Sequence, residues 1–136
     1  MIKGFACGVF DLYHPGHVLM LQDCKEHCDH LTVALNRSEN FSVDINPGKR
    51  SPYFSLQERK LVIESIKYVD AVIDYGTEEE LTEIMSSGGF DVRFLGDDYQ
   101  GKPITAREAI AKIVYIDRSH GYSTSELVKK IRTSNQ

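Results

Sequence analysis

The sequence predicts one α/β domain built on a doubly wound, parallel five-stranded sheet with helices on both faces. Three observations predict this fold. A length of 136 residues suits a single domain, taken as residues 1–136, with a sizeable core. Short apolar runs alternate with segments of helical periodicity, which is the order expected of a parallel sheet. The first apolar run is hydrophobic on both faces near its end, as buried parallel strands are.

The first strand and the helix after it are the most clearly marked elements. Residues 2–10 form the expected strand. Pro15 suits the first turn of a helix, and Val18 and Leu19 follow it at positions expected on the apolar side. A second apolar strand is expected at residues 31–36.

A long polar connection separates the second strand from the next helix. Residues 37–54 contain Pro and Gly, which oppose regular structure, and long loops in compact domains usually have a function. Ser55 is placed to cap the next helix, with Glu58 three positions later completing a capping box. Leu61 is expected on the apolar side of that helix.

The second half of the chain continues the alternation. Thr77 is expected to cap a helix that ends at Gly88–Gly89, and a last helix is expected from near Ser123 to about Arg132. The remaining strands are expected at residues 69–74, 91–96 and 112–117.

The glycine-rich and polar stretches follow the strands. In a doubly wound sheet, ligands bind beyond the carboxyl ends of the strands, at the switch point beside the first strand. We therefore expect these stretches to form one site. They are Gly8–His17 after the first strand, Lys49–Arg50 after the second, Gly96–Asp98 at the end of the fourth and Arg118–Thr124 after the fifth.

Composition narrows the kind of ligand. A formal net charge of −4 argues against binding to a nucleic-acid backbone. No apolar run reaches the roughly 18 residues that a bilayer span needs, so no membrane partner is expected. Three cysteines do not make a disulfide framework, which favours reduced thiols and the cytoplasm. A zinc site at Cys24 and Cys28 is a weaker alternative, because closed zinc sites draw ligands from separate elements; no metal ligand is predicted.

His14 and His17 are the clearest candidates for chemistry. They lie three residues apart at the start of a helix, so both rings are expected on one face of the first turn. Free backbone N–H groups and the helix dipole favour anions there, and Gly16 removes a side chain that would block the approach of a phosphate. The pattern predicts a polyphosphate site.

His14-Pro15-Gly16-His17 resembles the HxGH signature of a superfamily of nucleotidyltransferases with a Rossmann-like fold. The resemblance covers nearly the whole chain and is closest to the cytidylyltransferases, above all those that act on glycerol 3-phosphate. The ordered set is more specific than the tetrapeptide alone. It comprises Gly8 to His14, Arg59-Lys60, Tyr68-Val69-Asp70, Gly96-Asp97-Asp98 and Arg118-x-x-Gly121-x-Ser123-Thr124.

The resemblance implies that CMP is transferred from CTP to a phosphorylated acceptor, with release of pyrophosphate and no covalent enzyme intermediate. It also implies Mg²⁺ bound with the nucleotide and a homodimer. A phosphate monoester is already a competent nucleophile at neutral pH, because its second pKa is about 6. The enzyme mainly has to align two anions and neutralise the charge that develops on them.

The resemblance also implies roles for individual residues. His14 and His17 would donate to the α- and β-phosphates, while Arg118 and one or both of Lys49 and Arg50 supply positive charge. Ser123 and Thr124 would bind the outer phosphates, Asp98 the nucleoside, and Asp11 would orient the histidines or a metal-bound water. The nucleotide-binding set is Gly8, Val9, Phe10, Asp11, Gly16, Gly96, Asp97, Asp98, Gly121, Tyr122, Ser123 and Thr124.

The acceptor is less closely defined. Glycerol 3-phosphate is the first candidate, but Thr77-Glu78-Glu79-Glu80 stands where the glycerol-phosphate enzymes use lysine. The acidic run is either a solvated helix start or a contact for an ammonium group. Phosphocholine, phosphoethanolamine, a phosphorylated amino acid amide and a sugar phosphate therefore stay open as alternatives.

Three other functions compete with cytidylyl transfer. An adenylyltransferase of the same fold would share HxGH and use ATP. A nucleotide-binding module without activity would not need both histidines and Arg118. A dinucleotide-dependent dehydrogenase is disfavoured because no G-x-G-x-x-G follows the first strand.

Overall fold

The computed structural model describes residues 1–37 and 51–134, and its architecture confirms the predicted fold class. All neighbouring strands are parallel, in the order β3-β2-β1-β4-β5, so β1 is central. The chain fills one side of β1 first and then crosses to the other, which places the switch point at the carboxyl end of β1. The strands are β1 Lys3–Gly8, β2 His30–Asn36, β3 Ala71–Tyr75, β4 Val92–Gly96 and β5 Lys112–Ile116.

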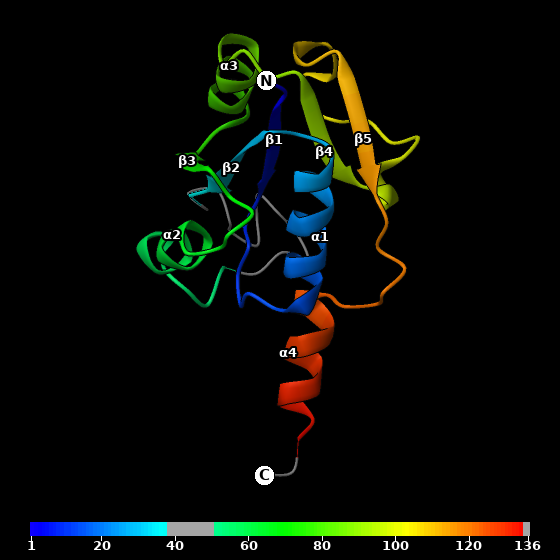
Figure 1. The fold of residues 1–136 in the computed structure, drawn as a ribbon. Coiled ribbons are helices and arrows are strands. Elements are labelled where there is room, and N and C mark those ends of the chain that lie inside the picture. The colour runs from blue at the N-terminus through cyan, green and yellow to red at the C-terminus, as the bar shows by residue number, and fades with distance from the viewer. Residues whose placement is uncertain (38–50, 135–136) are drawn as a thin grey trace.

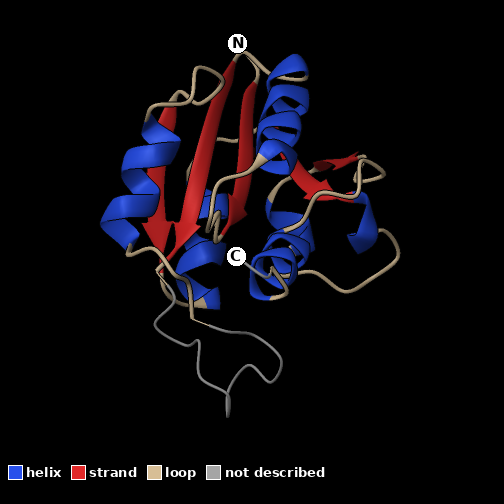
Figure 2. Cartoon of the chain, turned by 90° about the horizontal axis from the view of Figure 1, so that it is seen from below, coloured by secondary structure: helices blue, strands red, loops and turns tan. Residues whose placement is uncertain are grey.

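Helices cover both faces of the sheet (Figures 1 and 2). On one face, Leu21 and Cys24 of α1 and Ile63 of α2 are buried in a core cluster with strand residues. On the other, Leu81 and Met85 of α3 are buried in a second cluster. The helices are α1 Pro15–Glu26, α2 Leu56–Glu64, α3 Glu78–Ser87 and α4 Thr124–Arg132, with short 3₁₀ turns η1 Asp97–Tyr99 and η2 Arg107–Ala109. None within the described ranges is long and apolar enough to cross a membrane.

The predicted helix caps are present. Ser55 Oγ accepts the Glu58 N–H at 3.2 Å, and Glu58 Oε1 accepts the Ser55 N–H at 2.9 Å, so the capping box at α2 is complete. Thr77 Oγ1 accepts the Glu80 N–H at 3.1 Å and caps α3. These elements begin where local sequence places them.

Two strand boundaries differ from the prediction by two residues, and the others differ by at most one. The first strand ends at Gly8 rather than at residue 10, because Phe10 (φ 53°) and Leu12 (φ 51°) adopt left-handed conformations that leave the sheet. The third strand begins at Ala71 rather than at residue 69, because Asp70 is turned to accept the Leu31 N–H at 2.8 Å.

Helix packing also corrects the expectation of which helix residues face the sheet. Leu61, expected on the apolar side of α2, is 72% exposed, whereas Arg59 is only 2% exposed. On α1, Val18 and Leu19 are exposed and Leu21 is buried. Periodicity alone does not show which of several neighbouring residues faces the sheet.

Arg59 ties together the segments that shape the carboxyl edge of the sheet. Its Nη1 donates to the carbonyls of Val9 at 3.0 Å and Asn36 at 2.8 Å, which follow β1 and end β2. Its Nε donates to the carbonyl of Phe54 at 3.2 Å, just before α2. One buried guanidinium therefore donates to carbonyls from three segments and joins them.

Replacing Arg59 by Met is expected to lower the free energy of unfolding by about 3 kcal/mol, because buried carbonyls lose their donor. Urea unfolding measures this change. The neighbouring Lys60→Met is the matched control. Lys60 Nζ lies 3.6 Å from Asp74 on a partly exposed surface, so its loss should cost no more than about 0.5 kcal/mol. Equal effects of the two variants would contradict the role given to Arg59.

Candidate active site

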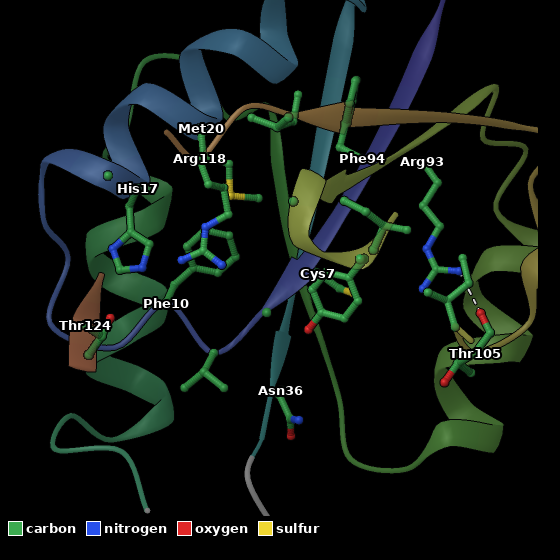
Figure 3. Close-up of a pocket in the computed structure, with 18 of the residues that line it drawn as sticks. Cys7, Phe10, His17, Met20, Asn36, Arg93, Phe94, Thr105, Arg118 and Thr124 are labelled. Atoms are coloured by element: carbon green, nitrogen blue, oxygen red, sulfur yellow. Dashed lines mark hydrogen bonds between the residues drawn. The ribbon is translucent and has the colours of Figure 1, made fainter. Parts of the chain in front are cut away.

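A cavity of about 520 Å³ opens at the carboxyl edge of the sheet (Figure 3). It brings together three of the four stretches expected there, those after β1, β4 and β5. The fourth, Lys49 and Arg50, lies outside the described residues. The predicted residues that line the cavity are Gly8, Val9, Phe10, His14, Gly16, His17, Gly96, Arg118, Tyr122 and Thr124.

His14 and His17 cap α1 reciprocally. His14 Nδ1 accepts the Gly16 N–H at 3.0 Å, and His17 Nδ1 accepts the His14 N–H at 3.2 Å. The rings stack with centroids 3.8 Å apart. Because each Nδ1 is an acceptor, a neutral ring must carry its hydrogen on Nε2. The helix cap therefore fixes the tautomer of both histidines.

The source of the anion donors differs from the expectation. Backbone N–H groups of the first turn are not free: Gly16 N–H bonds to His14 Nδ1, and His17 N–H bonds to the His14 carbonyl at 2.9 Å. The cap itself consumes these donors. The donors that α1 can present to an anion are thus the two Nε2–H groups, and that of His14 must first exchange its contact with Thr124 Oγ1, 3.2 Å away, for the anion.

Both rings are held neutral. Burial, followed by the positive influence of His14 and Arg118, lowers the pKa of His17 to about 3. Burial, with His120 and Arg118 nearby, also lowers the pKa of His14. At neutral pH the pair offers hydrogen-bond donors without adding charge, so the fixed charge beside it comes from Arg118.

The start of α4 completes this wall of the cavity. His14 Nε2 lies 3.2 Å from Thr124 Oγ1, which donates to the Asp11 carbonyl at 3.3 Å. Figure 1 shows α4 beginning beside the start of α1. Ser123 is the N-cap of α4 and accepts the Glu126 N–H at 3.1 Å. Gly121 has a φ of 80°, so the turn before α4 needs a residue that adopts left-handed backbone.

The Asp11 carboxylate has a structural role, besides the role near the histidines that was expected for it. It is 4% exposed, and its carboxylate accepts the N–H groups of Tyr53 at 2.7 Å and Phe54 at 3.0 Å. Its connection to His14 runs through its backbone carbonyl and Thr124. The carboxylate thus holds the segment before α2 against the loop that follows β1.

Asp97 and Asp98 hold Arg118. Asp98 Oδ2 accepts from Arg118 Nη1 at 3.3 Å, and Asp97 Oδ2 accepts the Arg118 N–H at 3.3 Å. Gly96 makes room for this arrangement, since a Cβ there would lie 2.5 Å from Asp98 Oδ1 and 2.8 Å from Arg118 Cδ. The turn after β4 therefore positions the cation of the turn after β5.

Gly16 is required by the packing of the site. A Cβ at this position would lie 2.8 Å from His14 Cε1 and 2.9 Å from Tyr122 Cβ. Any side chain would displace the His14 ring or the loop before α4. Gly16 is therefore needed because it leaves room for the His14 ring, in addition to the room that it leaves for a phosphate.

The cavity continues past the histidines to the α3 face, where the sequence offered only the acidic run that includes Glu78 as a possible acceptor contact. We call His14, His17, Arg118 and Thr124 the histidine half of the cavity. The other lining side chains named here form the arginine half: Cys7, Asn36, Tyr75, Glu78, Arg93 and Thr105. Arg93 pairs in register with Phe5 in the middle of the sheet. A charged residue inside the apolar strand Val92–Gly96 is the sequence feature that could have marked Arg93.

Cys24 and Cys28 lack two features of a zinc site in the described parts of the chain. Burial raises the pKa of Cys24, and burial also raises that of Cys28, whose thiol donates to the Cys24 carbonyl at 3.4 Å. Both therefore stay protonated, whereas zinc binds thiolates. Across residues 1–37 and 51–134, no three His, Cys, Asp or Glu side chains are arranged to hold a metal ion.

Comparisons with known proteins show which proteins the chain is similar to. The model of the cytidylyltransferase-like family matches residues 5–134. The chain is 34% identical to glycerol-3-phosphate cytidylyltransferase of Bacillus subtilis, covering 96% of this chain and 98% of that one. It is 35% identical to the bifunctional protein HldE of Gluconacetobacter diazotrophicus, but spans only 27% of that protein. Its fold is similar to a lipopolysaccharide core biosynthesis protein of Thermoplasma volcanium, with a TM-score of 0.67, 31% identity, and coverage of 85% of this chain and 96% of that one.

The depressed pKa of His17 predicts loss of stability in acid. In the unfolded chain, His17 is protonated below its ordinary pKa of 6.5. In the folded protein, the same ring stays neutral down to about pH 3. Stability should therefore fall as pH decreases from about 6.5, by about 2 kcal/mol at pH 5 from this residue. His17→Gln should reduce the loss seen by urea unfolding at pH 7 and pH 5.

The same ring can be observed directly. Nitrogen-15 NMR of the wild-type protein should show a neutral His17 with its hydrogen on Nε2 at pH 5. A protonation midpoint above pH 6, or a hydrogen on Nδ1, would contradict the capping geometry.

Proposed function

The chain belongs to the cytidylyltransferase-like family of nucleotidyltransferases, and on that premise we propose that it transfers CMP from CTP to a small phosphorylated acceptor. Pyrophosphate is the other product. Glycerol 3-phosphate is the first candidate acceptor, because a relative that matches the chain nearly end to end is named for it. The observation that carries the proposal is the pair of neutral histidines, with fixed Nε2–H donors, in the same cavity as Arg118.

The protein forms no covalent bond with the substrates in the proposed reaction. An oxygen of the acceptor phosphate attacks the α-phosphorus of CTP, a P–O bond forms, and the bond to the β-phosphate oxygen breaks. The leaving pyrophosphate takes the electron pair of that bond. At neutral pH the acceptor phosphate is largely a dianion, so no general base has to remove a proton.

The histidine half is suited to hold the triphosphate. The Nε2–H groups of His14 and His17 donate to the α- and β-phosphates, where negative charge shifts during transfer. Arg118 supplies the cation and exchanges its contact with Asp98 for phosphate oxygens. Thr124, already bonded to His14, adds a hydroxyl for the outer phosphates. Asp98 is then released to meet the nucleoside, and Lys49 and Arg50 remain candidates for further positive charge.

Mg²⁺ is proposed to enter with the nucleotide. The donor set fits a metal held through phosphate oxygens and waters, since no cluster of three protein ligands exists within residues 1–37 and 51–134. When bound, Mg²⁺ neutralises charge on the triphosphate. The chain's own residues orient the phosphates around it.

CTP is favoured over ATP by Gly96-Asp97-Asp98 and by Arg118 to Thr124, which resemble the cytidylyltransferases. Adenylyl transfer would use the same histidines, so it is the alternative that a nucleotide panel separates. A homodimer in the cytoplasm completes the proposal. The free thiols of the three cysteines suit a reducing compartment, and sedimentation at micromolar concentration would test the dimer.

Replacing His14 by Asn is expected to lower kcat by about 10²-fold or more, because a transition-state donor is lost. Asn is a good N-cap, so the variant should keep α1 and the thermal midpoint. His17→Ala should lower kcat similarly. Pyrophosphate release with saturating CTP measures both, and turnover within a few-fold of wild type would contradict the assignment.

The nucleotide is tested with the wild-type protein and each of the four ribonucleoside triphosphates over a panel of acceptor phosphates. CTP should support the largest kcat/KM. A preference for ATP would replace cytidylyl by adenylyl transfer. An absence of turnover with every pair, combined with retained nucleotide binding, would indicate a non-catalytic binding module.

A further inference from the structure

Arg93 is a buried cation with an unused donor. The residue is 4% exposed, and its Nη1 donates to the Thr105 carbonyl at 2.6 Å (Figure 3). Its Nε is buried and has no hydrogen-bond partner. None of the salt bridges in the described parts of the chain includes it. A buried guanidinium without a carboxylate is costly, and such groups are commonly completed by a ligand.

The groups beside Arg93 do not supply the missing charge. Burial raises the pKa of the Cys7 thiol, and burial also raises the pKa of the Tyr75 phenol, so both stay neutral. Among the described residues that line the cavity, Glu78 is the one acid, but it is exposed to water and accepts the Thr105 hydroxyl. Water weakens the electric field of the exposed Glu78 carboxylate more than the protein interior weakens that of the buried Arg93 guanidinium. The arginine half therefore favours oxygen acceptors over cations.

The shape of the cavity indicates which part of the substrates lies near Arg93. Arg93 and the histidines line one continuous space, which passes from the α1 face to the α3 face over the carboxyl end of β1. If the histidine half holds the triphosphate, the reacting phosphate of the acceptor must lie beside that half. The rest of the acceptor then extends towards the arginine half.

We propose that Arg93 binds the non-reacting end of the acceptor through hydroxyl or carboxylate oxygens. The acceptor is then the phosphate of a polyol, sugar or hydroxy acid, and phosphates that end in an ammonium group are excluded. This inference rests on the proposed function. It assigns to the acceptor a residue that no sequence motif identified and decides among the acceptors that the sequence left open.

The test compares the wild type with Arg93→Met and with Arg107→Met. Arg107 is the matched control, because it is an exposed arginine that donates to a backbone carbonyl, that of Lys102 at 3.2 Å, in the same segment. The acceptors are glycerol 3-phosphate, 3-phosphoglycerate and phosphoethanolamine. The first two share a carbon skeleton and separate hydroxyl from carboxylate recognition, while the third carries the ammonium group.

Arg93→Met should raise the KM of the oxygen-bearing acceptor by about 10-fold or more, as expected for loss of a charged hydrogen-bond donor. The KM of CTP should stay within two-fold, and Arg107→Met should change neither. Phosphoethanolamine should be used at least about 10-fold less well than the better of the other two. A merely structural role would move both KM values together and lower the thermal midpoint.

Two results would overturn the inference: preference for phosphoethanolamine, or an unchanged acceptor KM in Arg93→Met. If Arg93→Met does not fold, Arg93→Lys serves instead, because lysine keeps the charge but lacks the planar set of N–H donors of the guanidinium group. Arg93→Lys should raise only the acceptor KM. Failure of the proposed function is distinguishable, because no pyrophosphate would then form from CTP with any acceptor. Even so, the thermal shift given by each acceptor alone would still report binding at Arg93.

Discussion

The reciprocal cap between His14 and His17 is the interaction on which the rest of the site depends. It ends the loop after β1, starts α1 and fixes which ring nitrogen carries the hydrogen. Burial keeps the pKa of His17 far below neutrality, so the donors are uncharged. One local motif thus folds the helix and prepares the chemistry, and Thr124 couples it to α4, 110 residues away in sequence.

Around this cap, buried polar groups hold the loops in place. Arg59 collects the carbonyls that follow β1 and end β2, while Asp11 fixes the segment before α2. Asp97 and Asp98 set the position of Arg118. Each contact joins segments distant in sequence, so the cavity is a product of the sheet order. The reacting groups lie on loops, and the parallel sheet supplies the rigidity.

The sequence predicted what local rules determine. The capping box at Ser55, the cap at Thr77, the doubly wound parallel sheet and the convergence of the loops after β1, β4 and β5 all follow from spacing and residue type. Tertiary contacts determined the rest. Whether Arg59 or Leu61 faces the sheet depends on carbonyls that other segments present, and Arg93 is buried because the segment at Thr105 covers it. Free N–H groups at α1 were wrongly expected, because ring nitrogens can accept them as readily as an anion.

The fate of the phosphates tests the central claim most directly. CTP labelled at either the α- or the γ-phosphorus is incubated with Mg²⁺, the protein and the acceptor that it uses best. The account predicts that the α label moves to the acceptor product and the γ label leaves in pyrophosphate, with no label bound covalently to the protein. Transfer of the γ label to the acceptor, or a covalently labelled protein on the path to product, would contradict attack of the acceptor phosphate on the α-phosphorus.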